Sequence, residues 1–397
     1  MTRRLPPDNP ATTGPMVPGP DNGVVLCALD DDYALFSEPQ QRVYQLSPIS
    51  GPIWLGVSAG EPASRIARFV ANETGCRLDE ANDYISSCLV EWEKLALLKQ
   101  GLMEPIRPKS RSDESPEPIS AIREIYCVSG AMIAISFPDS SAKRAWNAIA
   151  GHLRHGQTGV AETEITVGAC EDGYWIAHQP GERASFGDPA ALAVGLKEAV
   201  LHAVLRPRPD WIALHAAVLS SASGAIALAG SSGQGKTTLA ALLSASGMSA
   251  IADDVALVTA QPPGLRGLAF AFAAKPGSWE LLRTRFPNLD RLPKYRRPDG
   301  RTVKYIQPVR SSEQAGAITA IIFPRYSIMT PLRITHVRKL NALVSLLNEA
   351  MNASQWLTAK GFVALSTMIN DAVVIRMEYD DANTGAEWIK MNLIKAG

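Results

Sequence analysis

The chain has 397 residues, of which 46% are hydrophobic and 20% charged, the composition of a globular protein with two or three domains. Its 39 basic residues equal its 39 acidic residues, so net charge gives no reason to expect nucleic acid or an anionic membrane as a partner. No apolar run approaches the roughly 20 residues that cross a bilayer. The five cysteines include no C-x-x-C pair, which favours reduced thiols over a zinc site. We therefore expect a cytoplasmic protein that binds neither nucleic acid nor membrane.

The first hundred residues read as a tail followed by a small domain. Residues 1–22 are rich in proline and lack an apolar core, which predicts a disordered tail and no secretory signal. In residues 23–100, apolar runs in VVLCALDDDYALFS flank a turn-prone DDD, which predicts strands. Helical spacing then predicts a helix that stops at Gly75 and a second helix with Asp79 as its N-cap. The predicted order is two or three strands followed by helices.

The rest of the chain divides by composition. Residues 101–120 are rich in proline, serine and charge, which predicts a linker. Residues 121–205 predict a mixed α/β region, with strands in AMIAISF, AETEITVGAC and GYWIAHQ and a helix in PAALAVGLKEAVLHAVL. Residues 206–397 change to buried strand, loop, helix and buried strand. The runs IALHAAVLS and GAIALAG each predict a strand, and SAIADDVALV predicts either a pair of strands or one strand with a kink. The fold class predicted from these patterns is α/β.

One motif carries specific chemistry. The stretch GSSGQGKT fits G-x-x-x-x-G-K-[ST] at every fixed position, after one apolar run and before a helical one. Its glycines let backbone amides curl around phosphate oxygens, Lys236 supplies charge to the β- and γ-phosphates, and the Thr237 hydroxyl can bind Mg²⁺. The motif predicts a nucleotide site formed by Gly230, Ser231, Ser232, Gly233, Gln234, Gly235, Lys236, Thr237 and Thr238.

Two further features lie near this loop in the sequence. Asp253 and Asp254 follow the apolar run MSAIA, and the carboxyl end of a strand is where a doubly wound sheet presents catalytic groups. Adjacent residues of a strand point to opposite faces, so the two carboxylates are expected to act separately. His215 lies fifteen residues before Gly230. On residue chemistry alone, a solvated strand end and a core histidine are the alternative interpretations.

The stretch LHAAVL…AGSSGQGKTTLAALLSASGMSAIADDVALV, within about Trp211–Thr259, resembles the HPr kinase/phosphorylase family and its relatives, which are serine kinases. The resemblance implies a P-loop kinase domain of the HPr-kinase type, with ATP and Mg²⁺ as cofactors and assembly into a homo-oligomer. It implies that Asp254 is the general base, that Lys236 and His215 belong to the active site, and that Asp253 supports it.

Outside that stretch the family pattern is matched less closely. Thr237 is the implied metal-binding hydroxyl, and Glu280 in KPGSWELL lies near the position of the family's metal-binding glutamate. Arg301 and Arg310 are the candidates for its catalytic arginine. AAKPGSWELL is closer to the divergent HPr-kinase-related proteins than to the enzymes that phosphorylate HPr. Lys275 is either an anion contact or a solvated loop lysine.

Residues 24–98 resemble the PqqD-like peptide-binding domains, in VLCALDDDYALFS, YQLSPISGPIW, EPASRIARFV and a last helix ending in LALL. The resemblance implies a small winged-helix-like α+β fold, with Leu46 and Trp54 near its core and Tyr33–Phe36 near its strands. It also implies that residues 23–100 hold the leader of a ribosomally made precursor peptide as an added strand. A generic winged-helix module is the alternative.

Together the resemblances imply an ATP-dependent kinase of peptide biosynthesis, which phosphorylates a serine or threonine of the precursor peptide. The linker would hold the core peptide near the active site at an effective concentration of about millimolar. Two alternatives remain: a regulatory serine kinase acting on an HPr-like carrier protein, and a non-catalytic nucleotide-binding switch. ATP is implied by the resemblance alone, because no base-reading motif is visible.

Overall fold

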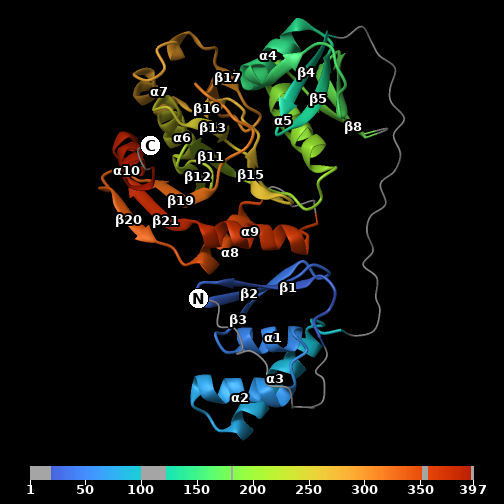
Figure 1. Cartoon of the computed structure of the whole chain (residues 1–397). Helices are drawn as coiled ribbons and strands as arrows, with labels where there is room; N and C mark the ends of the chain where they lie inside the picture. Colours follow the sequence, from blue (N-terminus) through green and yellow to red (C-terminus); the bar gives the residue numbers. More distant parts are fainter. Residues whose placement is uncertain (1–18, 100–121, 180–181, 351–355, 395–397) are drawn as a thin grey trace. The chain divides into compact units, whose positions relative to one another are not determined.

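The computed structural model describes residues 19–99, 122–179, 182–350 and 356–394 (Figure 1). Over these residues it is a mixed α/β protein with several sheets and ten α-helices. The predicted disordered tail and linker, residues 1–22 and 101–120, fall almost wholly outside the described residues. The chain divides into two compact units, which are described separately. The smaller unit comprises Met1–Lys109, Arg338–Val344 and Ser354–Asn370, and the larger comprises Ser110–Val337, Ser345–Ala353 and Asp371–Gly397.

The smaller unit begins with three antiparallel strands in the order β1-β2-β3, followed by three helices. These are β1 (Val24–Leu29), β2 (Asp32–Ser37), β3 (Arg42–Leu46), α1 (Ser50–Ser58), α2 (Ala63–Thr74) and α3 (Leu78–Lys94). The predicted stop at Gly75 is confirmed, because this residue ends α2 with a left-handed φ of 70°. The predicted N-cap at Asp79 is wrong. Arg77 is the N-cap, because its backbone N–H donates to the Glu80 carboxylate (3.1 Å), and Asp79 lies in the first turn.

The core of the smaller unit lies between the sheet and its three helices. Leu46 and Trp54 are both buried there, and the Trp54 ring meets Trp92 edge-on with centroids 4.9 Å apart. All six residues of β2 are buried, so the second face of the sheet is covered as well. The cover is α9 (Ala359–Asp371), which lies on the opposite side of the sheet from α1 (Figure 1).

Residues 338–344 and 356–370 are fixed to the sheet by apolar and polar contacts. Phe362 of α9 stacks on Phe36 with centroids 4.8 Å apart. Polar contacts surround this pair, namely Arg338 with Asp32 (2.7 and 2.8 Å), Lys339 with Asp30 (2.7 Å), the Ala359 N–H with Glu38 (2.9 Å) and Asn370 with the Ala28 carbonyl (2.7 Å). The smaller unit is therefore built from three segments, two of which lie far from the first in the chain.

The first part of the larger unit is a six-stranded sheet in the order β6-β4-β5-β7-β8-β9. Its strands are β4 (Ile122–Val128), β5 (Ala131–Phe137), β6 (Arg154–Gly156), β7 (Thr163–Cys170), β8 (Gly173–Gln179) and β9 (Glu182–Phe186). Helices α4 (Ser140–Ala150) and α5 (Pro189–Leu205) pack on it, and Asp139 and Asp188 cap their N-termini. Their core continues into later parts of the chain, because Trp146 meets Phe270, which precedes β16 (Phe272–Ala274), edge-on with centroids 5.6 Å apart.

The second part of the larger unit is a six-stranded mixed sheet in the order β13-β11-β12-β19-β21-β20. Its strands are β11 (Ala216–Ser221), β12 (Gly224–Ala229), β13 (Ser249–Ala252), β19 (Ile318–Tyr326), β20 (Arg333–His336) and β21 (Val373–Tyr379). Strands β12, β19 and β21 are parallel. Helix α6 (Lys236–Ala245) follows β12, and α10 (Ala382–Leu393) follows β21.

Two small sheets and two helices complete the larger unit. One sheet joins β10 (Ile212–Leu214), β14 (Ala256–Ala260) and β15 (Pro263–Gly267), and the other joins β16 (Phe272–Ala274), β17 (Tyr295–Arg296) and β18 (Thr302–Ile306). Helix α7 is Pro276–Arg283, and α8 (Lys339–Asn348) starts in the smaller unit and ends here. Within the described ranges, no helix is long and apolar enough to cross a bilayer.

Candidate functional site

The glycine-rich loop lies between the end of β12 and the start of α6. Gly230, Gly233 and Gly235 have φ of 124°, 93° and 93°, a region that side chains other than glycine rarely adopt. A Cβ at Gly230 or Gly233 would meet no atom within 4 Å, so the loop is open on that side. A Cβ at Gly235 would overlap the Tyr379 hydroxyl. The other predicted loop residues lie around this opening: Ser231 and Ser232 are exposed, and Gln234, Thr237 and Thr238 are half-buried.

Lys236 reaches back across the loop from the first turn of α6. Its ammonium donates to the carbonyls of Gly230 and Ser231, the second at 3.0 Å. Burial lowers the pKa of Lys236, while the Glu349 carboxylate opposes this shift most strongly. Glu349 also accepts a hydrogen bond from the Ser231 hydroxyl (3.0 Å). The charge of Lys236 is thus held at the first two residues of the loop.

Two chain crossings bring the other predicted residues together. Strands β10 and β14 pair in one sheet, and β11 and β13 pair in another. His215 lies on the crossing from β10 to β11, and the aspartates lie on the crossing from β13 to β14. Because both crossings join the same two sheets, His215 and Asp254 meet, with Nδ1 and Oδ1 3.3 Å apart.

The two aspartates have separate partners. Asp253 is 4% exposed and accepts a hydrogen bond from the Ala273 N–H at Oδ2 (3.0 Å). Its Oδ1 is buried without a hydrogen-bond partner among the described residues. Burial, with the neighbouring charge of Asp254, raises the pKa of Asp253 to about 6, and the hydrogen bond from the Ala273 N–H opposes this shift most strongly, with a smaller contribution from the neighbouring Thr237 hydroxyl.

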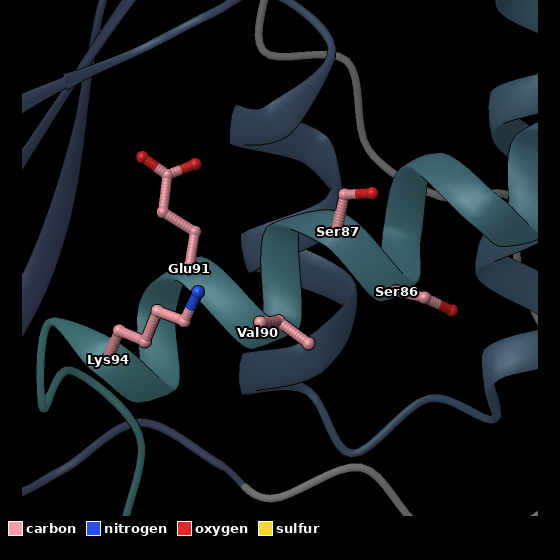
Figure 2. A pocket seen from close by; sticks show the side chains of 5 residues that line it. All are labelled: Ser86, Ser87, Val90, Glu91 and Lys94. Carbon is pink, nitrogen blue, oxygen red and sulfur yellow. The ribbon is translucent and has the colours of Figure 1, made fainter.

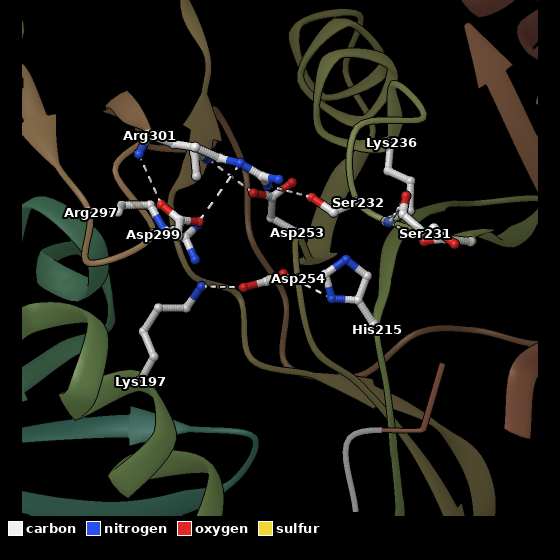
Figure 3. A network of polar contacts seen from close by, with 12 residues as sticks. Lys197, His215, Ser231, Ser232, Lys236, Asp253, Asp254, Arg297, Asp299 and Arg301 are labelled. Atoms are coloured by element: carbon white, nitrogen blue, oxygen red, sulfur yellow. Dashed lines mark hydrogen bonds and ion pairs between the residues drawn. The ribbon is translucent and has the colours of Figure 1, made fainter. Parts of the chain in front are cut away.

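Asp254 is instead paired with Lys197 of α5, whose Nζ lies 2.5 Å from Oδ2 (Figure 3). The Lys197 ammonium holds the pKa of Asp254 well below its usual range, and His215 adds to the effect. Burial lowers the pKa of His215, which favours the neutral imidazole. Asp254 is therefore an ionised carboxylate fixed from two sides.

A turn rich in arginine faces the loop from β17 and β18. The Arg301 guanidinium donates to the Ser232 hydroxyl (2.9 Å), and Lys275 lies 3.5 Å from the same oxygen. Asp299 lies between Arg297 and Arg301, at 3.7 and 3.9 Å, so these cations outnumber their carboxylate (Figure 3). Burial, with the charges of Arg301 and Arg297, lowers the pKa of Lys275.

Two predicted residues lie apart from this cluster. Glu280 is exposed on α7, and the described residues give it no polar contact with Thr237 or Asp253. Arg310 is exposed, and its carbonyl accepts a hydrogen bond from the Ala250 N–H (2.9 Å). Of the two arginine candidates, the structure places Arg301 at the loop.

The described residues contain no group of three His, Cys, Asp or Glu able to hold a metal ion on its own. The unpaired Oδ1 of Asp253 and the Thr237 hydroxyl are nevertheless adjacent hard oxygen donors. Mg²⁺ commonly uses one or two protein oxygens and completes its shell with waters and phosphate oxygens. The two residues fit such an ion.

Among the described residues, β3 pairs with β2 alone, so the smaller unit has an unpaired strand edge there. The two-residue turn Asp30–Asp31 makes Leu29 and Asp32 a hydrogen-bonded pair of β1 and β2. Hydrogen-bonded and non-hydrogen-bonded pairs alternate along antiparallel strands, so the backbone N–H and C=O groups of Val43 and Gln45 in β3 point away from β2. Both residues are exposed. The unit also has a shallow pocket of about 400 Å³ on α3 (Figure 2), lined by Ser86, Ser87, Val90, Glu91 and Lys94.

No family model matches the chain, and no curated protein matches it. Among solved structures, one match is described as TbiB1 in complex with the TbiA(beta) leader peptide. It is 17% identical, covers 22% of this chain and 99% of that chain, and has a TM-score of 0.20. A likeness at this TM-score carries no argument about this chain.

Proposed function

We propose that the chain is an ATP- and Mg²⁺-dependent kinase, related to the HPr kinases, that phosphorylates a serine or threonine hydroxyl of a ribosomally made precursor peptide. The observation that supports this most directly is the convergence on one loop of a buried lysine, an ionised carboxylate and surplus cations. A glycine-rich loop alone would bind a nucleotide, whereas Asp254 held beside it by Lys197 and His215 adds a group able to receive a hydroxyl proton.

The loop and its cations would stabilise the charge of the transferring group. Loop amides and Lys236 would contact the β- and γ-phosphates. Arg301, which donates a hydrogen bond to the Ser232 hydroxyl, would contact further phosphate oxygens. Thr237 and Asp253 would hold Mg²⁺, which when bound neutralises phosphate charge. In phosphoryl transfer, such positioning and charge stabilisation supply most of the catalysis.

Asp254 would orient the acceptor hydroxyl and accept its proton. Its low pKa makes it a weak base but keeps it ionised at neutral pH. A weak base suffices where the transition state is loose, because the hydroxyl then loses its proton late. Lys197 and His215 fix the carboxylate, so the hydroxyl meets an oxygen that is already in place.

The smaller unit would hold the leader, in the manner of the PqqD-like domains. An extended peptide added at β3 would pair with the outward backbone groups of Val43 and Gln45, giving affinity through main-chain hydrogen bonds. The exposed side chains beside them would select the leader sequence. The strand order β1-β2-β3 supports this proposal, because β3 lies at an edge of its sheet.

Incubation of the full chain with Mg²⁺, γ-labelled ATP and short peptides encoded beside its gene tests the proposal by mass spectrometry. We expect one peptide to gain one phosphate. Asp254→Asn should abolish the gain, whereas Asp290→Asn, which changes an exposed aspartate paired with Arg283, should not. Loss of the leader should slow transfer. Transfer only to an HPr-like carrier would favour the regulatory kinase, and nucleotide binding without transfer would favour the switch.

A further inference from the structure

The two sides of the glycine-rich loop carry different groups. On one side of β12 lie β11 and β13, and the aspartates follow β13. On the other side lie β19 and β21, both parallel to β12, so their carboxyl ends reach the edge of the sheet where the loop begins. These strands end at Tyr326 and Tyr379. Neither tyrosine has a part in the proposed transfer.

Tyr326 stands beside the last glycine of the loop. A Cβ built at Gly235 would lie 3.7 Å from the Cβ of Tyr326. The Tyr326 ring meets the buried Tyr379 ring edge-on, with centroids 6.0 Å apart. Tyr326 nevertheless remains 49% exposed. It is therefore an aromatic ring supported on one side by packing and open to solvent on another.

The residues after Tyr326 extend this apolar surface. Ile328 is 74% exposed and Met329 is 87% exposed. The turn that presents them is fixed, because the Ser327 N–H donates to the Tyr379 carbonyl (2.9 Å) and the Thr330 N–H to the Ser327 carbonyl (3.2 Å). Met329 has a φ of 59°, an unfavourable conformation for a side chain other than glycine. The turn thus holds two large apolar side chains outward at a conformational cost.

The loop itself gives the direction of a bound triphosphate. Lys236, the β/γ-phosphate contact, lies at the carbonyls of Gly230 and Ser231, so the γ end belongs at the start of the loop. The other end of the triphosphate then lies toward Gly235 and the first turn of α6. That end carries the ribose and the base, and Tyr326 is the exposed aromatic residue beside it.

We infer that Tyr326, with Ile328 and Met329, forms the platform on which the base of the bound nucleotide stacks. The inference rests on the proposed nucleotide site. Stacking uses the face of the base, which adenine and guanine share, and side chains of this kind read no hydrogen-bonding edge. The site therefore takes nucleoside triphosphates with little preference between ATP and GTP.

Calorimetric titration of the full chain with ATP, GTP and inorganic tripolyphosphate, each with Mg²⁺, tests the platform. Tyr326→Ala should weaken ATP and GTP binding alike, by about tenfold, and leave tripolyphosphate binding unchanged. Tyr326→Trp should keep the affinity for ATP. Tyr84→Ala, which removes an exposed tyrosine of α3, should change none of the three.

Three results would overturn the inference: an equal loss for ATP and tripolyphosphate, an unchanged ATP affinity, or a loss confined to ATP or GTP. The proposed function has a separate outcome, because a kinase without this platform would still bind tripolyphosphate and transfer phosphate. If the wild-type chain bound neither tripolyphosphate nor ATP, the nucleotide site itself would be wrong.

Discussion

Asp253 and Asp254 are neighbours in sequence but lie in opposite electrostatic surroundings. Asp253 is enclosed and its carboxylate is costly to ionise, whereas Asp254 is ionised against Lys197. The sequence predicted that adjacent carboxylates would separate, because strand residues alternate in direction. It did not predict Lys197 or Glu349, since these lie 57 residues before Asp254 and 118 after Ser231.

The raised pKa of Asp253 predicts a pH-dependent stability. An aspartate with a folded-state pKa of about 6, against 3.8 in the unfolded chain, contributes stability below pH 4 that is lost as pH rises through 6. Asp253→Asn should remove the cost of ionising this buried carboxylate and stabilise the metal-free protein at pH 8 by on the order of 1–3 kcal/mol. Urea unfolding in the presence of a metal chelator should show a smaller gain in the free energy of unfolding at pH 5. A gain of equal size at both pH values would contradict the assigned pKa.

The Lys197 pair predicts the opposite dependence. The depressed pKa of Asp254 contributes stability above the usual aspartate range, and this is lost as pH falls through the folded-state value. Lys197→Met should therefore cost about 1–3 kcal/mol at pH 7 and less near pH 4. Lys197→Arg keeps the charge and should recover part of the loss. Equal stability of Lys197→Met and wild type at pH 7 in urea titrations would show that the pair is not formed.

At the scale of elements, the site lies where two apolar runs are interrupted. The sequence suggested one strand in IALHAAVLS, and it left SAIADDVALV open between a kinked strand and a strand pair. Each run is divided between two sheets, and the breaks fall at His215 and at the aspartates. The loop and α6 were predictable, because glycines and helical spacing are local signals. The breaks were not, because pairing of β10 with β14 is a long-range contact.

A comparison of Gly235 with Gly247 distinguishes the cost of steric overlap from the cost of backbone strain. Gly235 and Gly247 both have left-handed φ, of 93° and 108°, but only at Gly235 would a Cβ overlap another residue, the Tyr379 hydroxyl. Gly247→Ala should cost about 1–2 kcal/mol from strain alone. Gly235→Ala should cost more and weaken nucleotide binding, and adding Tyr379→Phe should restore part of the loss. Thermal unfolding compares the variants, and equal costs at both glycines would argue against the overlap.

At the scale of the whole molecule, the smaller unit is completed by residues from near the other end of the chain. Local patterns predicted two or three strands followed by helices, but not the cover over β2. A strand buried on both faces differs from a strand buried on one face mainly in its content of apolar residues. The sequence of β2, DYALFS, mixes apolar and polar residues, so it does not distinguish the two cases. The helix containing Phe362 could not be assigned to this sheet from periodicity, because spacing does not identify the surface on which a helix packs.

The stacked pair Phe36–Phe362 tests this cover. Each of Phe36→Ala and Phe362→Ala removes a fully buried ring and should destabilise the smaller unit by about 3–5 kcal/mol. The double variant should cost less than the sum of the single variants, by about 0.5–1.5 kcal/mol, because the rings contact each other. Hydrogen exchange at β2 amides measures the effect, with Tyr84→Ala as control. Strict additivity would mean that the rings do not interact.

The split origin of the smaller unit also affects its biosynthesis. About 240 residues separate Lys99 from Arg338, and ribosomes add about 5–20 residues per second. The sheet face that carries Phe36 would thus stay exposed on the nascent chain for roughly 10–50 s before α9 is made. Chaperone binding to ribosome-bound chains should peak in this interval. The same arrangement means that the smaller unit cannot be moved to another protein as an N-terminal cassette unless residues 338–344 and 356–370 accompany it.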